Sequence, residues 1–216
     1  MSEPLILGFD TSAAHCAAAL LRGDQLLAYR REEMSRGQAE RLMPLLEGML
    51  AEQDIGWRNL TAIGVGVGPG NFTGIRISVS AARGLALGLG IPAIGVSTFD
   101  ALRFGHDATM IAAVKGPADR TYVQLGSGDP ILCGPDDMPD YPEKAEPNLV
   151  AYPSVEALAL DTELMEVPSC FPLAEAIARH ALARGFDQIE PPAPLYIKSA
   201  DAAPSRDAPP VMLDDA

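Results

Sequence analysis

Residues 61–89, TAIGVGVGPGNFTGIRISVSAARGLALGL, contain the pattern that decides the fold. The apolar run at 61–67 predicts a buried strand, and the apolar sequence from about 75 to 89 predicts a helix. Between them lies a glycine-rich loop at 68–74, where the backbone can adopt positive φ angles and approach a neighbour closely. A strand, a short loop and a helix in this order favour an α/β fold, and such loops are common anion-binding positions.

The loop matches neither of the standard phosphate-binding motifs. A P-loop requires Gly-Lys followed by Ser or Thr, and this loop has no lysine. The dinucleotide motif requires a third glycine at the position that Thr73 occupies. The candidate residues of this motif loop are Gly68, Pro69, Gly70, Asn71, Phe72, Thr73, Gly74 and Arg76. As a phosphate site the loop is therefore only weakly specific.

A second candidate site follows the apolar run at 5–9, where Asp10, Thr11 and Ser12 end a predicted strand. A carboxylate, two hydroxyls and free backbone amides at such a position can hold nucleotide phosphates or their Mg²⁺. The same side chains can instead satisfy the amides of their own turn. Taken alone, the residues leave both interpretations open.

The rest of the chain continues the alternation of strands and helices. The predicted strands are a hairpin at 16–21 and 25–31, followed by 91–96, 110–114, 121–125 and 148–152. The predicted helices cover about 42–53, begin again at a capping box at 97–100, and return at 173–183 with Gly185 as C-cap. Proline- and aspartate-rich loop is expected at 126–147. This order indicates an α/β layer with a mixed sheet.

The helix predicted after the motif loop carries small residues on one side, at Ser80, Gly84 and Gly88. Each interior glycine costs about 1 kcal/mol relative to alanine, so close packing must compensate for it. Such a stripe allows another helix to approach at the short end of the usual range of about 8–10 Å. The stripe can equally pack on the chain's own sheet.

The charge of the chain is strongly uneven. The 216 residues include 16 Lys and Arg against 29 Asp and Glu, for a net charge of −13. Residues 1–110 carry 9 basic and 11 acidic side chains, whereas residues 111–216 carry 7 and 18. Since acidic surfaces repel phosphate backbones, the balance disfavours a protein that binds nucleic acid by itself.

The inventory of catalytic and metal-binding residue types is small. The cysteines at 16, 133 and 170 and the histidines at 15, 106 and 180 show no disulfide or metal-ligand spacing, and no nucleophile-elbow motif occurs. No catalytic residue and no metal ligand are therefore predicted. The N-terminus resembles no signal peptide, and the longest apolar stretch is too short to span a bilayer. We expect a cytoplasmic protein that is not associated with membranes.

Three segments occur in the order LILGFDTS at 5–12, ERLMPLL at 40–46 and VGVGPGNFTGIRI at 65–77. Together with 82–86, 91–97 and 194–198, they resemble the TsaB (YeaZ) family, the small subunit of the bacterial tRNA threonylcarbamoyladenosine machinery. The likeness is dense over 4–104 and sparse afterwards. It implies the actin-like ATPase (ASKHA, ribonuclease H-like) α/β fold, with two lobes built on mixed sheets. The expected organisation is an N-terminal lobe at 1–104, a smaller acidic lobe at 105–199 and a disordered tail at 200–216.

The resemblance implies an accessory subunit with no activity alone. In this fold an Asp-containing turn and a second glycine-rich loop hold the nucleotide phosphates, and the second loop is missing here. Residues 10–12 are thus expected to be a degenerate phosphate turn, and the chain to hold no cofactor on its own, with ATP possible in the complex. Many relatives have a histidine where this chain has Gly37, Gln38 and Ala39, which further weakens a metal role.

The resemblance also implies partners. TsaB-like proteins pair with TsaD, the transferase that modifies the adenosine beside the anticodon, and a TsaE-type ATPase joins them. The docking surface is expected at Leu42, Leu45, Leu46, Met49, Ser80, Gly84 and Gly88. Two copies of the chain are expected to pair when the partner is absent, and tRNA is expected to contact mainly the partner. The alternatives are a metallopeptidase-like protein (glycoprotease) and a stand-alone ATPase of the same fold.

Overall fold

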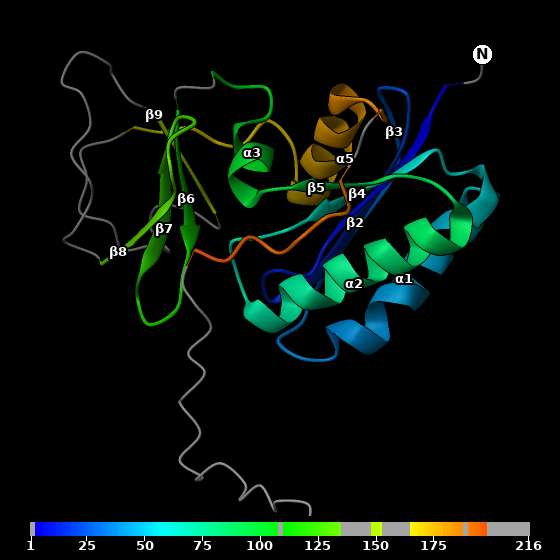
Figure 1. Ribbon diagram of the computed structural model, residues 1–216, viewed down its shortest axis with the longest axis horizontal. Coiled ribbons are helices and arrows are strands. Elements are labelled where there is room, and N and C mark those ends of the chain that lie inside the picture. The colour runs from blue at the N-terminus through cyan, green and yellow to red at the C-terminus, as the bar shows by residue number, and fades with distance from the viewer. Residues whose placement is uncertain (1–2, 108–109, 135–147, 153–164, 188–189, 198–216) are drawn as a thin grey trace, which may run out of the picture.

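The computed structural model describes residues 3–107, 110–134, 148–152, 165–187 and 190–197 (Figure 1). A first sheet of five strands has the order β3-β2-β1-β4-β5. Its strands are β1 (Leu5–Asp10), β2 (His15–Arg22), β3 (Gln25–Glu33), β4 (Ala62–Gly66) and β5 (Ala93–Val96). The first three pair antiparallel, and β1, β4 and β5 run parallel, so the sheet is mixed as predicted.

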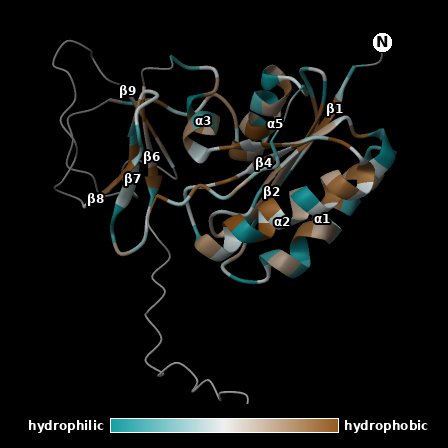
Figure 2. Cartoon of the chain, in the orientation of Figure 1, coloured by the Kyte–Doolittle hydropathy of each residue, from teal (hydrophilic) through white to brown (hydrophobic). Residues whose placement is uncertain are grey.

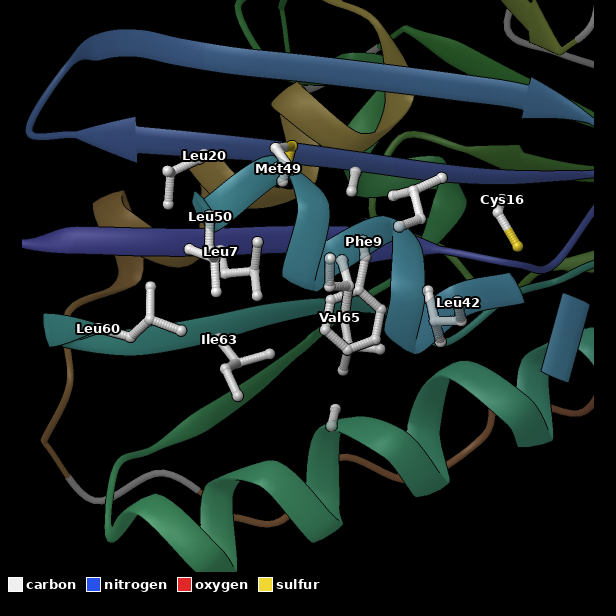
Figure 3. Close-up of a cluster of buried hydrophobic side chains, with 14 of the residues drawn as sticks. Leu7, Phe9, Cys16, Leu20, Leu42, Met49, Leu50, Leu60, Ile63 and Val65 are labelled. Atoms are coloured by element: carbon white, nitrogen blue, oxygen red, sulfur yellow. The ribbon is translucent and has the colours of Figure 1, made fainter. Parts of the chain in front are cut away.

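Helices α1 (Gln38–Glu52) and α2 (Phe72–Leu89) cover one face of the first sheet. Residues of β1 alternate between the two faces, and Leu7 and Phe9 point toward these helices into the largest hydrophobic core. Figure 3 shows this core, with Leu42, Met49 and Leu50 of α1 packed over the strands. Figure 2 shows hydrophobic residues (brown) along the central strands, which agrees with the burial of both faces of the sheet.

Helix α5 (Leu173–Arg184) covers the opposite face of the same sheet. It approaches closely because β1 and β4 present glycines there. A Cβ atom at Gly8 would lie 2.6 Å from the carbonyl oxygen of Ala174, and one at Gly64 would lie 3.0 Å from that of Ile177. The predicted boundary that assigned all of 105–199 to the second lobe is therefore wrong for α5, whose apolar face completes the first lobe.

The second sheet has the order β10-β9-β6-β7-β8 and is also mixed. Its strands are β6 (Ile111–Lys115), β7 (Thr121–Leu125), β8 (Ile131–Cys133), β9 (Asn148–Tyr152) and β10 (Met165–Glu166). The six-residue helix α3 (Thr98–Arg103) packs against β6 and β9, and its residues Phe99 and Leu102 belong to the core of this lobe. The short strands agree with the expectation of a reduced second lobe.

The C-terminal segment 190–197 runs between the two sheets (orange in Figure 1). The amide of Leu195 donates a hydrogen bond to the carbonyl oxygen of Val67, at 2.8 Å, and its side chain packs against the cores of both lobes. The predicted tail at 200–216 lies outside the described residues. No helix in the described ranges is long and apolar enough to span a membrane.

Candidate functional site

A cleft of about 710 Å³ lies between the two lobes. Its lining includes residues from the turn after β1, the start of β2, the motif loop, β6, β9 and the C-terminal segment. They include Ser12, His15, Asn71, Phe72, Lys115, Tyr152 and Tyr196. The predicted phosphate turn and the motif loop therefore meet at the same cleft, which only the tertiary structure could show.

The side chains of the predicted phosphate turn form hydrogen bonds within the protein. Asp10 and Thr11 are fully buried, and Ser12 is nearly so. Asp10 Oδ1 accepts hydrogen bonds from the amide and the hydroxyl of Ser12, both at 2.9 Å. The Thr11 hydroxyl donates to the carbonyl oxygen of Gly74 at 2.7 Å. Because both hydroxyls already donate to protein oxygens, the arrangement does not fit phosphate binding and agrees with the turn-stabilising interpretation.

The remaining carboxylate oxygen of Asp10 does not change this assignment. Oδ2 is buried and has no hydrogen-bond partner among the described residues. It lies against Gly66, where any added Cβ atom would overlap it. Asp10 is not among the residues that line the cleft. Within the described part of the chain, no three His, Cys, Asp or Glu residues are grouped as metal ligands would be.

His15 and Tyr152 connect this turn to the second lobe. His15 is buried, and its Nε2 lies 2.9 Å from Asp10 Oδ1, so Nε2 carries the proton that the carboxylate accepts. Its Nδ1 then accepts from the Tyr152 hydroxyl at 3.1 Å. Burial raises the pKa of the Tyr152 hydroxyl above its usual range, which keeps it protonated as a donor. The series Asp10–His15–Tyr152 thus links β1, β2 and β9.

Neither His15 nor Tyr152 was predicted as a site residue. His15 lies between the predicted strands at 5–9 and 16–21, and the antiparallel pairing of β1 with β2, which was not predicted, brings the start of β2 back alongside Asp10. Tyr152 is 137 residues away from His15, and no local pattern relates the two. Their contact follows from the way the lobes are joined.

The main role of the motif loop is structural: it connects the 10–12 turn to the start of α2. The amide of Asn71 donates to the carbonyl oxygen of Ser12 at 2.6 Å, and the Asn71 side chain caps α2 by accepting from the amide of Gly74 at 2.9 Å. Side chains at Gly70 and Gly74 would overlap the carbonyl oxygens of Ser12 and Thr11. The two glycines are therefore explained by the close approach of the 10–12 turn, without any ligand.

Other residues of the loop hold neighbouring elements. Thr98 at the start of α3 donates from its amide to Gly68 O at 2.8 Å and from its hydroxyl to Pro69 O at 3.2 Å. Phe72 is half-buried and contacts Tyr196 with ring centroids 5.0 Å apart. Thr73 and Arg76 are exposed. The loop therefore joins β1, α3 and the C-terminal segment at one place.

The predicted docking residues fall into two groups. Leu42, Leu45, Leu46 and Met49 are at most 4% exposed and belong to the first core. Their assignment to a partner surface is wrong, because the apolar face of α1 covers the chain's own sheet. By contrast, Ser80, Gly84 and Gly88 are exposed on α2.

The exposed face of α2 also contains a large apolar residue that was not predicted. Leu87 is 88% exposed and follows Gly84 by three positions, on the same side of the helix. A Cβ atom at Gly84 or Gly88 would meet nothing within 4 Å. Close packing inside the described chain therefore does not explain these two glycines.

Comparisons with known proteins identify relatives of the chain by sequence. A family model described as "TsaD: tRNA N6-adenosine threonylcarbamoyltransferase" matches residues 31–126. The TsaB of Haemophilus influenzae, a tRNA threonylcarbamoyladenosine biosynthesis protein, is 35% identical over 128 residues, 56% of this chain and 53% of that protein. The Escherichia coli TsaB is 36% identical over 122 residues, 54% of this chain and 52% of that protein. The chain thus spans about half the length of the curated relatives it matches.

The solved structure of YeaZ from Pseudomonas aeruginosa superposes with a TM-score of 0.68 at 26% identity, over 84% of this chain and 93% of that one. The two mixed sheets and this likeness confirm the predicted α/β fold with two lobes built on mixed sheets. The resemblance to the TsaB (YeaZ) family, which the segments at 5–12, 40–46 and 65–77 indicate, is confirmed by sequence in the first half of the chain and by structure over most of it.

Proposed function

We propose that the chain takes part in tRNA threonylcarbamoyladenosine biosynthesis as a non-catalytic assembly subunit that pairs with a TsaD-type transferase. The observation that carries this proposal is the exposed face of α2, where Leu87 protrudes beside Gly84 and Gly88. An isolated leucine on a surface is common, but here it stands on a smooth helix face that nothing in the described chain covers. A second helix packed there would bury the leucine and fill the space above the glycines.

The energetics of α2 support the same conclusion. Each glycine in a helix interior costs about 1 kcal/mol relative to alanine. In the described chain no contact above Gly84 or Gly88 offsets that cost. Contact with a partner helix offsets it, because the absence of side chains lets the two backbones approach at the short end of about 8–10 Å. The stripe is thus explained by pairing better than by folding.

The family match supports a TsaD-type partner in particular. Residues 31–126, which match the transferase family model, contain the whole of α1 and α2. Two proteins that share this helix pair can meet through equivalent faces, as subunits related by a two-fold axis do. The same face would pair two copies of the chain when the transferase is absent. A TsaE-type ATPase in the complex stays a prediction from the family resemblance.

Replacing Gly84 by leucine is expected to disrupt this pairing without unfolding the chain. The added side chain has free space in the subunit, and leucine is a better helix former than glycine, by about 0.8–1 kcal/mol. Size-exclusion chromatography with the TsaD-type transferase should show loss of the complex, while thermal melting shows no loss of stability. Ala183→Leu, which adds an exposed leucine to α5 on the other side of the sheet, should leave the complex intact. A complete complex with Gly84→Leu would exclude the α2 face.

The chain alone is expected not to bind ATP in the micromolar range. The hydroxyls of Thr11 and Ser12 are engaged within the protein, and Asp10 is fully buried. A calorimetric titration of the isolated chain with Mg-ATP should therefore show no binding heat at micromolar concentrations. Micromolar binding would favour a stand-alone ATPase instead. We infer that any nucleotide in the complex is held by another subunit.

A further inference from the structure

Arg76 on α2 is held in a fixed orientation although it is exposed. Its guanidinium carbon lies 3.7 Å from the centroid of the Phe72 ring, so the two groups stack. Its Nε–H donates to the hydroxyl oxygen of Tyr196 at 3.0 Å. The two terminal nitrogens have no hydrogen-bond or ion-pair partner in the part of the chain that the structure describes. The guanidinium fork is thus pre-positioned, with its terminal donors available.

A groove runs from this arginine along α2. It is lined by Arg76, Val79, Ser80, Arg83, Pro194 and Tyr196 and encloses about 480 Å³. Ser80 and Arg83 follow Arg76 by four and seven positions, so all three lie on one side of the helix. Arg83 is exposed and, among the described residues, forms no ion pair. The groove therefore presents two arginines separated by about two helical turns.

The charge of this helix is opposite to that of the protein. The chain has a net charge of −13, yet the sequence of α2 contains two arginines and no aspartate or glutamate. Arginine on a rigid platform binds a carboxylate through two parallel hydrogen bonds, and such charge-assisted bonds are about twice as strong as neutral ones. A basic groove beside an apolar face, on a protein that is acidic overall, is complementary to a partner whose contacting surface is acidic.

We propose that Arg76 and Arg83 form a receptor for carboxylate side chains of the partner subunit that covers α2. This inference rests on the proposed function and adds the chemistry of the partner's contacting surface. A protein is favoured over an RNA backbone because Gly84 and Leu87, exposed further along the same helix, form a smooth and partly apolar surface next to the groove that phosphates would leave in water. The arginines then set the register of the partner along α2.

The first test is charge reversal, measured as the affinity for the TsaD-type transferase. Arg83→Glu is expected to weaken the complex at least about tenfold at physiological salt, because like charges then face each other. Added salt should weaken the wild-type complex more steeply than that of the variant. Arg120→Glu, which makes the same charge change on the exposed turn after β6, should leave both properties unchanged. Unchanged affinity and salt dependence with Arg83→Glu would overturn the inference.

The second test identifies the partner's group directly. Arg83→Lys places an amine in the groove, and a zero-length carbodiimide reagent should then join it to a carboxylate of the transferase. Mass spectrometry of the cross-linked peptide should find an Asp or Glu of the partner, with no such product from Arg120→Lys. If no cross-link forms, or if Arg83→Glu reduces tRNA retention on filters instead of transferase affinity, the carboxylate receptor is wrong.

The two levels of the proposal fail separately. If Gly84→Leu removes the complex while Arg83→Glu does not weaken it, α2 is the docking face and the carboxylate receptor alone is excluded. If Gly84→Leu leaves the complex complete, the docking face itself is excluded.

Discussion

Replacing Gly74 by alanine is expected to lower the free energy of unfolding by at least about 3 kcal/mol, because an added Cβ would overlap the backbone of a neighbouring turn. The overlapped atom is the carbonyl oxygen of Thr11, which cannot rotate away as a side chain would. Thr11 is also held to Gly74 by the hydrogen bond from its hydroxyl. To relieve the overlap, the turn after β1 must move away from the start of α2, which breaks the hydrogen bonds between the 10–12 turn and the motif loop.

The matched control is the same substitution further along the same helix. Gly84→Ala adds a methyl group where there is free space, so it is expected to raise stability by about 1 kcal/mol through helix propensity. For a chain of this size 1 kcal/mol changes the melting temperature by roughly 2–4 °C. Thermal melts should therefore show a decrease of at least about 6 °C for Gly74→Ala and an increase for Gly84→Ala. Equal melting temperatures would contradict the proposed contact of Gly74 with Thr11.

Replacing His15 by alanine is expected to destabilise the protein by at least about 2–3 kcal/mol, because it removes a hydrogen bond to a buried carboxylate. Asp10 would lose one of the hydrogen bonds to its buried Oδ1, and the Tyr152 hydroxyl would lose its acceptor. The imidazole would also leave a cavity at the floor of the cleft. Denaturant unfolding monitored by circular dichroism measures this loss.

A milder variant separates the hydrogen bond between the lobes, Tyr152 to His15, from the hydrogen bond within the first lobe, His15 to Asp10. Tyr152→Phe removes only the hydroxyl and leaves His15 Nδ1 without its donor, for an expected cost of about 1–3 kcal/mol. In the His15→Ala background the same change should cost almost nothing, since the bond is already absent. If the two effects are additive, the hydrogen bond between His15 and Tyr152 does not contribute to stability.

The first sheet could be predicted from sequence because its central strands are buried on both faces. Such strands are nearly continuous apolar runs, as at 61–67, and their type is clear without knowledge of their neighbours. Helix α5 was also predicted, with Gly185 at its end. The packing of α5 on the first sheet was not predicted. Amphipathic periodicity shows that a helix has an apolar face, but it does not show which surface of the protein covers that face.

The same limitation explains the error at α1. The apolar face of α1 was predicted correctly, as Leu42, Leu45, Leu46 and Met49. On the basis of the family resemblance it was assigned to a partner contact, whereas it covers the chain's own sheet. In the cleft, the 10–12 turn and the motif loop were identified by their residue types. Their mutual contact and the role of His15 depended on distant segments, which local sequence does not relate.

The packing of α5 on β1 and β4 determines when the first lobe can be complete. Every strand of the first sheet is translated before residue 97, but the face that contains Gly8 and Gly64 is covered only by residues 173–184. During synthesis from the N-terminus, the sheet must therefore wait for nearly the whole second lobe to be made before its apolar face is shielded from water. The first lobe thus cannot complete its packing until α5 has been synthesised, and until then the nascent chain exposes an apolar surface that chaperones can bind.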